Sequence, residues 1–593
     1  MPNPITLRAI IAGLSYAPSY ARDLLTSLLA RIGLGTPAFT RATVASLSDF
    51  EGNIKSVPSG CMRESGARFV YNSLLYSQDF TNVAWTMSQT TSAASAILSP
   101  DGVSFWQTLV ESGANSQHQI LQFKPTVAGQ GVYSCHAMDA GATGRYLTLY
   151  PQGITTGYAI FDLKNGVVTG TGGTNYLASG MIPLSGGGYR CWIRWTSSVN
   201  AATAFVSYLS NNSTTPAATY AGDGASKVYI WGAQYDNVTG QIVQTPGEYQ
   251  PTNTGAPNTT GADGCKYYAT KLDGTPIADA TMTGGLFEQA GTQILATADI
   301  RDMTTANWTL GATMTRARTS IGADGAANSA TRLTGGAVAA TNIITYLVTA
   351  AATSRTYSCL IKRITGSGPV RLTEDGFATN TDISGQLVLN TWVLVPVTQS
   401  QLNAVLGIKI DTNGDAIDVD MNQFEAGAIA SSRMLTTGAA RNADVEASPL
   451  PGNLGTTGWI AQTVTWQHAP SGTGYLWGSY TDANNALQML HDGTNAIARV
   501  RVGGVNYDAT IPLAYVAGTP AKIAIAFGSS RGVRIAVNGV LGTTNAYSGP
   551  AVLAATCHTG DAGDGTGQPY ANCKLQNYGN TDITDAALIA LTV

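Results

Sequence analysis

A segment that occurs twice limits the fold of this chain more than any other feature of its sequence. The stretch NSLLYSQDFTNVAWT at residues 72–86 returns in diverged form as TQILATADIRDMTTANWT at residues 292–309. Each copy has an apolar pair, a short polar run with an acidic residue, and a Trp before a Thr. The two tryptophans, Trp85 and Trp308, are 223 residues apart.

The match continues downstream at nearly the same offset. VYSCHAM around Cys135 matches TYSCLIK around Cys359, 224 residues later, and the two copies end with related segments. An offset this constant predicts that a whole domain is duplicated. It also predicts that these two cysteines and the two tryptophans are packing residues at equivalent positions. We therefore predict four regions along the chain: an N-terminal segment at 1–39, homologous domains at 40–262 and 263–446, and a different C-terminal domain at 447–593.

Composition and local patterning predict that these domains consist of β-strands. Only 11% of the residues are charged, where about 25% is usual, and the chain has 67 glycines. Short runs that alternate apolar and polar residues, such as YRCWIRWTSS at 189–198, are separated by Gly, Asn, Asp and Ser. This is typical of strands with one buried face joined by tight turns. The predicted fold class is mainly all-β, with tandem jelly-roll or β-sandwich domains and a short N-terminal helical segment.

The predicted helix spans residues 20–32 and ends before Gly33 and Gly35. Its apolar residues fall on one face at helical spacing. A lone amphipathic helix beside β domains needs an apolar partner, so it either covers the first β domain or serves as an assembly element. The stripe consists of Leu24, Leu25, Leu28, Leu29 and Ile32.

Charge, hydropathy and cysteine spacing exclude several classes of partner. A net charge of -4 gives no broad basic surface for phosphates, so nucleic acid is not an expected partner. The chain has no apolar run of about 18 residues, and the apolar patch at 9–14 is too short for a signal peptide. Seven cysteines, an odd number spread along the chain, are expected to be reduced and buried. Cys557 and Cys573 are the one candidate pair for a disulfide or a metal site, but with His558 alone beside them the four-ligand zinc pattern is missing.

Several phrases of the repeat resemble a known family. SLLYSQDFTNVAWT followed by LSPDG, and QFEAGAIASSRMLTTGAARNADV at the end of the second copy, look like jelly-roll modules of tailed-bacteriophage tail fibres, spikes and virion decoration proteins. Those modules are related to carbohydrate-binding modules. The resemblance covers residues 40–445 in two copies. The C-terminal region resembles laminin-G or concanavalin-like lectin sandwiches.

The resemblance implies a structural virion protein, a fibre, spike or collar or capsid decoration, that is assembled in the host cytoplasm. Its expected work is assembly and adhesion to host-surface glycans, without catalysis and without a cofactor. Its expected partners are other virion proteins and further copies of itself in a homotrimer, for which the stripe at 24–32 offers a seam. The alternatives are a polysaccharide-degrading tailspike and a structural spacer without a ligand.

No catalytic motif supports the enzyme alternative. The chain has no GxSxG at a strand–turn–helix, no HExxH and no P-loop. Glycoside hydrolysis needs two carboxyl groups, and the candidates are Glu374 with Asp375 and Asp418 with Asp420. In DTNGDAIDVD at 411–420 the EF-hand glycine and glutamate are missing, which leaves only a looser calcium site open.

Aromatic residues are the remaining candidates for sugar contacts. Trp192, Trp195 and Trp231 lie in predicted strands, where we expect them to pack in the core or in the space between the sheets. In the last region the turn SYTDANNAL brings polar and aromatic groups together, and it is the predicted glycan-binding site. Hairpin chemistry explains the same residues without a ligand, and it is the favoured interpretation. They are Tyr480, Asp482, Asn484 and Asn485.

Overall fold

The chain forms two compact units in the computed structural model, Phe69–Lys266 and the remainder (Met1–Arg68 with Tyr267–Val593). We call them the smaller and the larger unit. Strands β6 (Arg68–Tyr71) and β21 (Cys265–Tyr268) mark where the chain passes from one to the other. The residues that the structure describes are 20–22, 38–126, 128–141, 145–153, 157–197, 201–252, 263–435, 440–450, 454, 457–466, 468–470, 472–513, 515–528 and 530–593.

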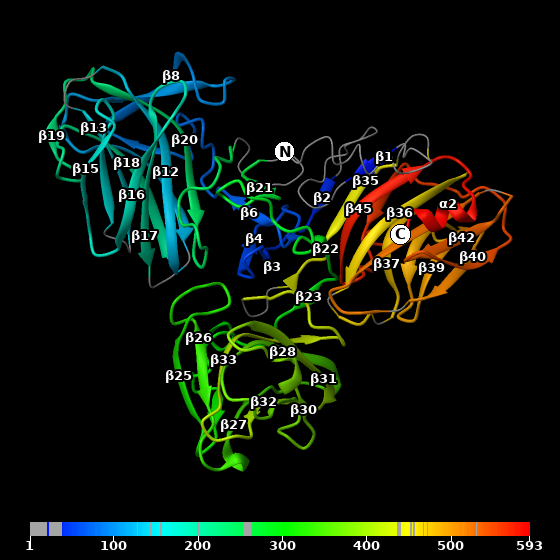
Figure 1. Ribbon diagram of the computed structural model, residues 1–593. Coiled ribbons are helices and arrows are strands. Elements are labelled where there is room, and N and C mark those ends of the chain that lie inside the picture. The colour runs from blue at the N-terminus through cyan, green and yellow to red at the C-terminus, as the bar shows by residue number, and fades with distance from the viewer. Residues whose placement is uncertain are drawn as a thin grey trace. The chain divides into compact units, whose positions relative to one another are not determined.

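The smaller unit is a sandwich of two six-stranded antiparallel sheets (Figure 1). The first sheet has the order β15 (Val167–Gly172), β14 (Tyr158–Asp162), β13 (Tyr146–Gln152), β18 (Ala201–Ser210), β11 (His118–Thr126) and β7 (Thr86–Ser88). The second has the order β16 (Tyr176–Pro183), β17 (Tyr189–Ser197), β12 (Gly129–Asp139), β20 (Lys227–Asn237), β9 (Phe105–Glu111) and β8 (Thr90–Leu98). Two short strands, β10 (Asn115–Ser116) and β19 (Tyr220–Ala221), pair beside them. Side chains from both sheets form one core cluster, because alternate residues of each strand point inward.

The larger unit contains a second sandwich with the same arrangement of strands in two five-stranded sheets. One has the order β24 (Trp308–Leu310), β27 (Ile343–Leu347), β32 (Val405–Ile410), β29 (Val370–Thr373) and β30 (Thr381–Asp382). The other has the order β25 (Thr315–Ser320), β26 (Ala330–Thr334), β33 (Ala416–Ala426), β28 (Thr353–Thr365) and β31 (Trp392–Gln401). Its short elements are η1 (Thr297–Asp299), η2 (Ala339–Thr341), η3 (Ser384–Gln386), β23 (Gly291–Thr292) and β34 (Ala440–Arg441).

The C-terminal sandwich includes strands from distant parts of the chain. One sheet has the order β43 (Val540–Asn545), β42 (Val533–Val537), β41 (Pro520–Phe527), β36 (Gly458–Trp466), β45 (Ala571–Gly579), β22 (Gly284–Phe287) and β5 (Glu64–Ser65), with β1 (Tyr20–Arg22) also paired to β45. The other has the order β2 (Ala38–Thr40), β35 (Val445–Pro449), β44 (Thr556–Thr559), β37 (Gly474–Asp482), β38 (Asn485–His491), β39 (Asn495–Val502) and β40 (Val505–Pro512). A short helix, α2 (Asp585–Ala590), and a hairpin, β3 (Ala45–Ser48) with β4 (Ile54–Val57), complete this unit.

The all-β fold class is confirmed, but the predicted N-terminal helix is wrong at its start. Tyr20–Arg22, its first three residues, form strand β1 on the C-terminal sandwich. Sheet pairing there overrides the helical spacing of the sequence. Leu24, Leu25, Leu28, Leu29 and Ile32 lie outside the described residues. Residues 40–68, which the sequence assigned to the first repeat, belong to the larger unit.

The repeated Trp has the same role in both sandwiches. Trp85 and Trp308 are 4% and 1% exposed, and each donates its indole N–H to a backbone carbonyl nine residues earlier, that of Tyr76 at 3.0 Å and that of Asp299 at 3.3 Å. Cys135 and Cys359 are fully buried core residues, as the repeat predicts. The ring of Phe80 packs on Trp85.

The second copy keeps this packing although its sequence lacks the aromatic residue. Met303, at the position of Phe80, is buried in the second core. The ring of Tyr346 supplies the aromatic contact to Trp308, at 4.9 Å between centroids.

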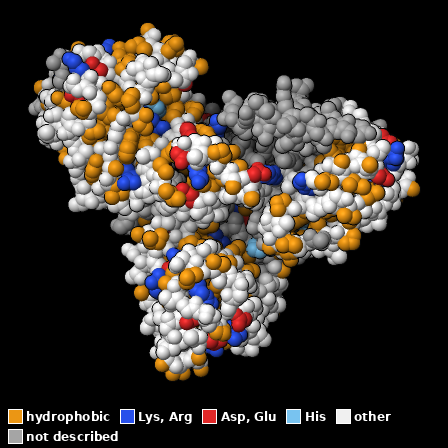
Figure 2. Space-filling model, in the orientation of Figure 1, with side chains coloured by type: hydrophobic (Ala, Val, Ile, Leu, Met, Phe, Trp, Pro, Cys, Tyr) orange, Lys and Arg blue, Asp and Glu red, His pale blue; other side chains and the backbone are white. Residues whose placement is uncertain are grey.

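Two other sequence expectations need correction. Cys61 and Cys265 are disulfide-bonded, whereas Cys557 and Cys573 form no disulfide. Trp195 lies in the core as predicted, but Trp192 lies half-buried on the outer face of β17. Trp231 is buried outside the main core cluster, against His136 and Tyr249. Charged side chains are sparse on the face shown in Figure 2, as the composition leads one to expect.

Candidate functional site

The outer face of the first sheet of the smaller unit carries an aromatic cluster that is separate from the core. In β13, Leu147 and Leu149 point into the core. The alternate residues, Thr148, Tyr150 and Gln152, therefore lie on the outer face. Neighbouring strands place further apolar side chains beside them: Tyr150 lies opposite Val206 of β18, and Thr148 lies opposite Tyr208.

Four aromatic side chains define this face, which we call the aromatic face: Phe123, Tyr150, Tyr158 and Tyr208. The Tyr150 ring contacts that of Tyr158 at 6.0 Å and that of Tyr208 at 6.5 Å between centroids. Phe123, on β11, is 65% exposed. An aromatic side chain this exposed on a strand gains little from folding and is available to a ligand.

Specific neighbours fix the rings of the aromatic face. Gly172 lies opposite Tyr158, and a Cβ atom there would lie 2.8 Å from the Tyr158 hydroxyl oxygen, so a glycine makes room for the ring. Gln152 donates its side-chain amide N–H to the Tyr208 hydroxyl at 2.6 Å. Burial raises the pKa of Tyr208 to about 12, so its hydroxyl keeps its proton.

Part of the face is closed and part is open. Val206 and Tyr208 are buried and pack with Ala217. Phe123, Tyr150 and Tyr158 stay exposed or half-exposed. Within the described part of the chain, no hydrogen bond engages the hydroxyls of Tyr150 and Tyr158, so both can pair with a ligand. The result is a short platform of aromatic rings with polar groups at its edge.

The second sandwich lacks this platform and has one ring on the equivalent face, that of Phe377 against Gly407 of β32. Its core residues Val370 and Leu372 match Leu147 and Leu149, which places Arg371 at the position of Thr148 and Thr373 at that of Tyr150. Lys409 lies opposite Arg371, as Tyr208 lies opposite Thr148.

A cluster of ion pairs occupies that face instead. Asp411 accepts from the Arg371 Nε at 2.7 Å, and its other oxygen lies 2.8 Å from the Lys409 Nζ. Leu347, at the position of Phe123, is 62% exposed but has no aromatic ring beside it on β29 or β32. The two copies therefore share a core and differ on this face.

The glycan-binding residues predicted from the sequence come together in one turn, between β37 and β38. Asp482 accepts from the Asn484 backbone N–H at 2.7 Å and from the Asn485 side-chain amide at 3.0 Å. Asn485 in turn accepts from the Gly503 N–H at 3.2 Å. Tyr480 lies at the end of β37, half-buried. The polar groups of this turn hydrogen-bond to one another, as they would in a hairpin without a ligand. The glycan site there stays a prediction.

The carboxylates considered for hydrolysis are engaged in structural contacts. Glu374 accepts from the Tyr357 N–H at 2.7 Å, and Asp375 accepts from Thr379. Asp418 pairs with Arg332 and Lys362, and Asp420 with Arg301. Both aspartates are buried. The contacts of Asp418 and Asp420 are ion pairs, and those of Glu374 and Asp375 are hydrogen bonds within the fold.

The loose calcium site at 411–420 is not assembled either. Asp411 is paired with two cations, and Asp415 accepts from the Gly368 N–H at 2.7 Å. Among the described residues, no three His, Cys, Asp or Glu side chains are grouped as metal ligands. None of the helices that the structure describes has the length and hydropathy of a membrane span.

Sequence reasoning missed the aromatic face because it searched turns and tryptophans. The signal is present in YLTLYPQ at 146–152, in which every second residue is a core residue. Only the pairing of β13 with β14 and β18 brings its outer tyrosine to the other rings, and this pairing joins residues up to 64 positions apart.

Comparison with known proteins gives structural matches only. No family model matches this chain, and no curated protein does. Solved structures that match include the CBM40 of Ruminococcus gnavus IT-sialidase bound to α2,3-sialyllactose, with 13% identity over 24% of this chain and 85% of that chain (TM-score 0.21). Domains LG4-5 of the mouse laminin α1 chain match with 10% identity over 40% and 85% (TM-score 0.20). The CBM22-1–CBM22-2 tandem of Paenibacillus barcinonensis Xyn10C matches with 9% identity over 62% and 100% (TM-score 0.18).

Proposed function

We propose that this chain is a non-catalytic structural protein of a tailed-phage virion and that its smaller unit binds glycans of the host surface. The aromatic face is the observation that carries the glycan part. Sugar rings stack on the faces of Tyr and Phe, while their hydroxyls pair with polar groups at the edge of the platform. Phe123, Tyr150 and Tyr158 with Gln152 supply both kinds of contact.

The virion part of the proposal is supported by sequence. The repeated phrases resemble modules of phage fibres, spikes and decoration proteins, and tandem sandwiches suit a protein that spans distance in a particle. In this proposal the second sandwich, with ion pairs where the aromatic face would be, works as a spacer and the first as the adhesive module.

The glycan part is tested by titrating the full chain with purified surface polysaccharide of the host. We expect saturable binding that Phe123→Ala and Tyr150→Ala each weaken about tenfold, because each removes one stacking ring. Leu347→Ala is the matched control at the equivalent exposed position of the second sandwich, and it should leave affinity unchanged. Equal affinity of all these proteins would refute the assignment of the site.

The assembly part is tested by light scattering of the intact chain. The homotrimer that the resemblance implies predicts three times the mass of one chain. A monomeric mass at micromolar concentration would contradict it. Release of reducing sugar from the same polysaccharide would instead favour the degrading tailspike.

A further inference from the structure

The larger unit contains a cavity of 1120 Å³ that the proposed function does not use. Side chains of β31, the turn of the β3–β4 hairpin, residues 428–433 and loops of the C-terminal sandwich line it. Its volume exceeds the range of about 300–1,000 Å³ common for small-ligand sites, so it suits an extended ligand. Four half-buried aromatic side chains line it: Phe50, Trp392, Tyr515 and Tyr570.

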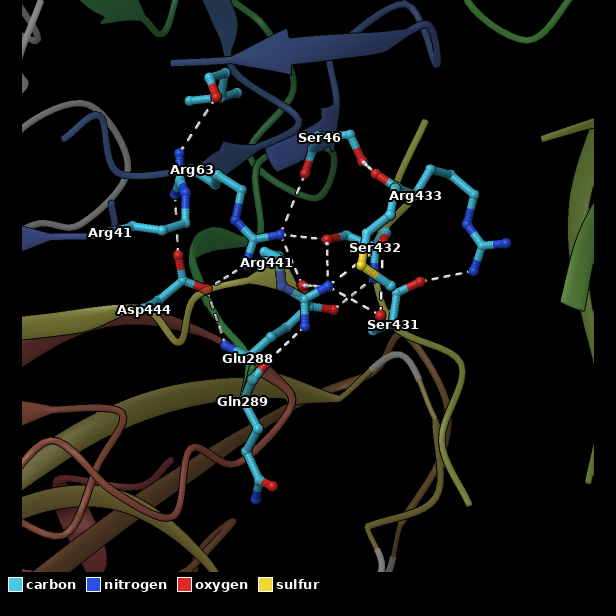
Figure 3. Close-up of polar contacts among 12 residues, drawn as sticks. Arg41, Ser46, Arg63, Glu288, Gln289, Ser431, Ser432, Arg433, Arg441 and Asp444 are labelled. Carbon is cyan, nitrogen blue, oxygen red and sulfur yellow. Dashed lines mark hydrogen bonds and ion pairs between the residues drawn. The ribbon is translucent and has the colours of Figure 1, made fainter. Parts of the chain in front are cut away.

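One wall of the cavity is held rigidly by buried polar groups (Figure 3). The Ser432 N–H donates to Glu288 at 2.9 Å, and the Arg433 guanidinium donates to the Ser431 carbonyl at 2.6 Å. Arg63 donates to the Ser432 hydroxyl at 2.5 Å and to Glu288 at 2.7 Å. A wall fixed in advance loses little freedom when a ligand binds.

Two further lining residues are held in defined positions. Lys362 Nζ lies 4.7 Å from the centroid of the Trp392 ring and so fixes one of its faces. Tyr570 has a φ of 52°, a left-handed conformation that is uncommon for a tyrosine and that the surroundings must hold in place. Such conformations cluster at binding sites.

The charges of the cavity do not suit an anionic ligand. Arg433 is the one Lys or Arg among the described lining residues, and its donors are engaged by backbone carbonyls and by Ser358. Asp49, Glu51 and Glu288 also line the cavity. Burial lowers the pKa of His468, so its imidazole is neutral and able to donate and accept.

An extended peptide is also disfavoured. Peptides add to an exposed strand edge through backbone N–H groups, and Pro396, in the middle of β31, has none. Aromatic faces with hydroxyl groups such as those of Ser432 and Thr398 are the chemistry that recognises uncharged polyhydroxylated chains.

We propose that this cavity binds a neutral oligosaccharide, with Trp392 and Tyr515 as stacking surfaces, at a second site independent of the aromatic face. The proposal goes beyond the proposed function and does not rest on it.

The test uses the full chain carrying Phe123→Ala and Tyr150→Ala, so that the aromatic face contributes nothing. Isothermal titration is carried out with maltohexaose, cellohexaose and laminarihexaose, and with sialyllactose as the anionic comparison. We expect saturable binding of at least one hexasaccharide, weakened about tenfold or more by Trp392→Ala. Ala517→Trp, at an exposed lining residue, should block the cavity without removing any packing, and Trp392→Phe should retain most of the affinity.

Four outcomes would overturn the proposal. These are no saturable binding of any of the three hexasaccharides at millimolar concentration, affinity unchanged by both Trp392→Ala and Ala517→Trp, tighter binding of sialyllactose, or displacement of the sugar by an extended peptide. Thermal unfolding of each variant shows whether it is folded, and Ala517→Trp keeps the test valid if Trp392→Ala is not. Failure of the proposed function is seen in a separate measurement, in which Phe123→Ala leaves the affinity for host polysaccharide unchanged.

Discussion

Glu374 is a buried carboxyl group at the end of β29 whose environment favours its neutral form. One of its oxygens accepts from the Tyr357 N–H at 2.7 Å, and the other has no hydrogen-bond partner in the described structure. Burial raises the pKa of Glu374 to about 7, against the opposing effect of that hydrogen bond. The proton of this side chain is therefore bound more tightly in the folded than in the unfolded chain.

This pKa predicts that Glu374 contributes less to the stability of the larger unit as the pH rises. Between about pH 4.5 and 7 this side chain binds its proton more in the folded than in the unfolded state, so its contribution to the free energy of unfolding falls with increasing pH through that window. Glu374→Gln should remove this contribution, about 2–3 kcal/mol at pH 8, and raise stability there while leaving it unchanged at pH 4. Denaturant unfolding of both proteins across this range checks it. Parallel pH profiles would show that Glu374 does not titrate on folding.

At the residue scale the sequence predicted packing better than chemistry. Trp85, Trp308, Cys135 and Cys359 were found by comparing the copies, because a core position keeps its type when a domain is duplicated. Glu374 was noticed only as one of a pair of acids. Its burial follows from strand pairing between residues far apart, which local sequence does not encode.

At the scale of elements, a buried ion network holds the added strands on the C-terminal sandwich. Asp444, which precedes β35, pairs with Arg41 at 3.0 Å and with Arg63 (Figure 3). It also accepts from the Glu288 N–H at 3.1 Å, and Glu288 pairs with Arg63 at 2.7 Å. These residues flank β2, β5, β22 and β35, so the network fixes strands from three parts of the chain.

Asp444→Asn is therefore expected to destabilise the larger unit strongly. It leaves two fully buried guanidinium groups with one carboxylate fewer, and breaking a buried pair in this way costs about 3–5 kcal/mol. Asp411→Asn is the matched control, because Asp411 pairs with Arg371 and Lys409 near the surface, where a pair contributes about 0–1 kcal/mol. Urea unfolding measures both. Similar effects of the two substitutions would mean that the buried network adds no stability beyond that of a surface pair.

Short strands are the elements that the sequence did not predict. The alternation of apolar and polar residues predicted the long strands. It did not predict that β2, β5 and β22, of two to four residues each, extend the C-terminal sheets. Strands this short have no readable period, and their partners lie hundreds of residues away, so the domain boundaries near residues 40 and 263 were drawn without them.

At the scale of the whole molecule, two compact units predict two unfolding transitions. The repeated Trp gives one position in each unit at which a substitution destabilises that unit alone. Trp85 lies in the smaller unit and Trp308 in the larger. Replacing either with Phe removes the indole donor and leaves a carbonyl, that of Tyr76 or of Asp299, without its partner. An unpaired buried acceptor costs about 1–3 kcal/mol.

Calorimetry of the full chain should then resolve the units. Trp85→Phe should lower one transition by a few degrees and leave the other in place, and Trp308→Phe should do the reverse, because each change acts within one core. The two substitutions are controls for one another, since they remove the same group from equivalent positions. A single transition whose temperature both substitutions lower equally would contradict this prediction. It would mean that the two units unfold together as one cooperative body although each has its own core.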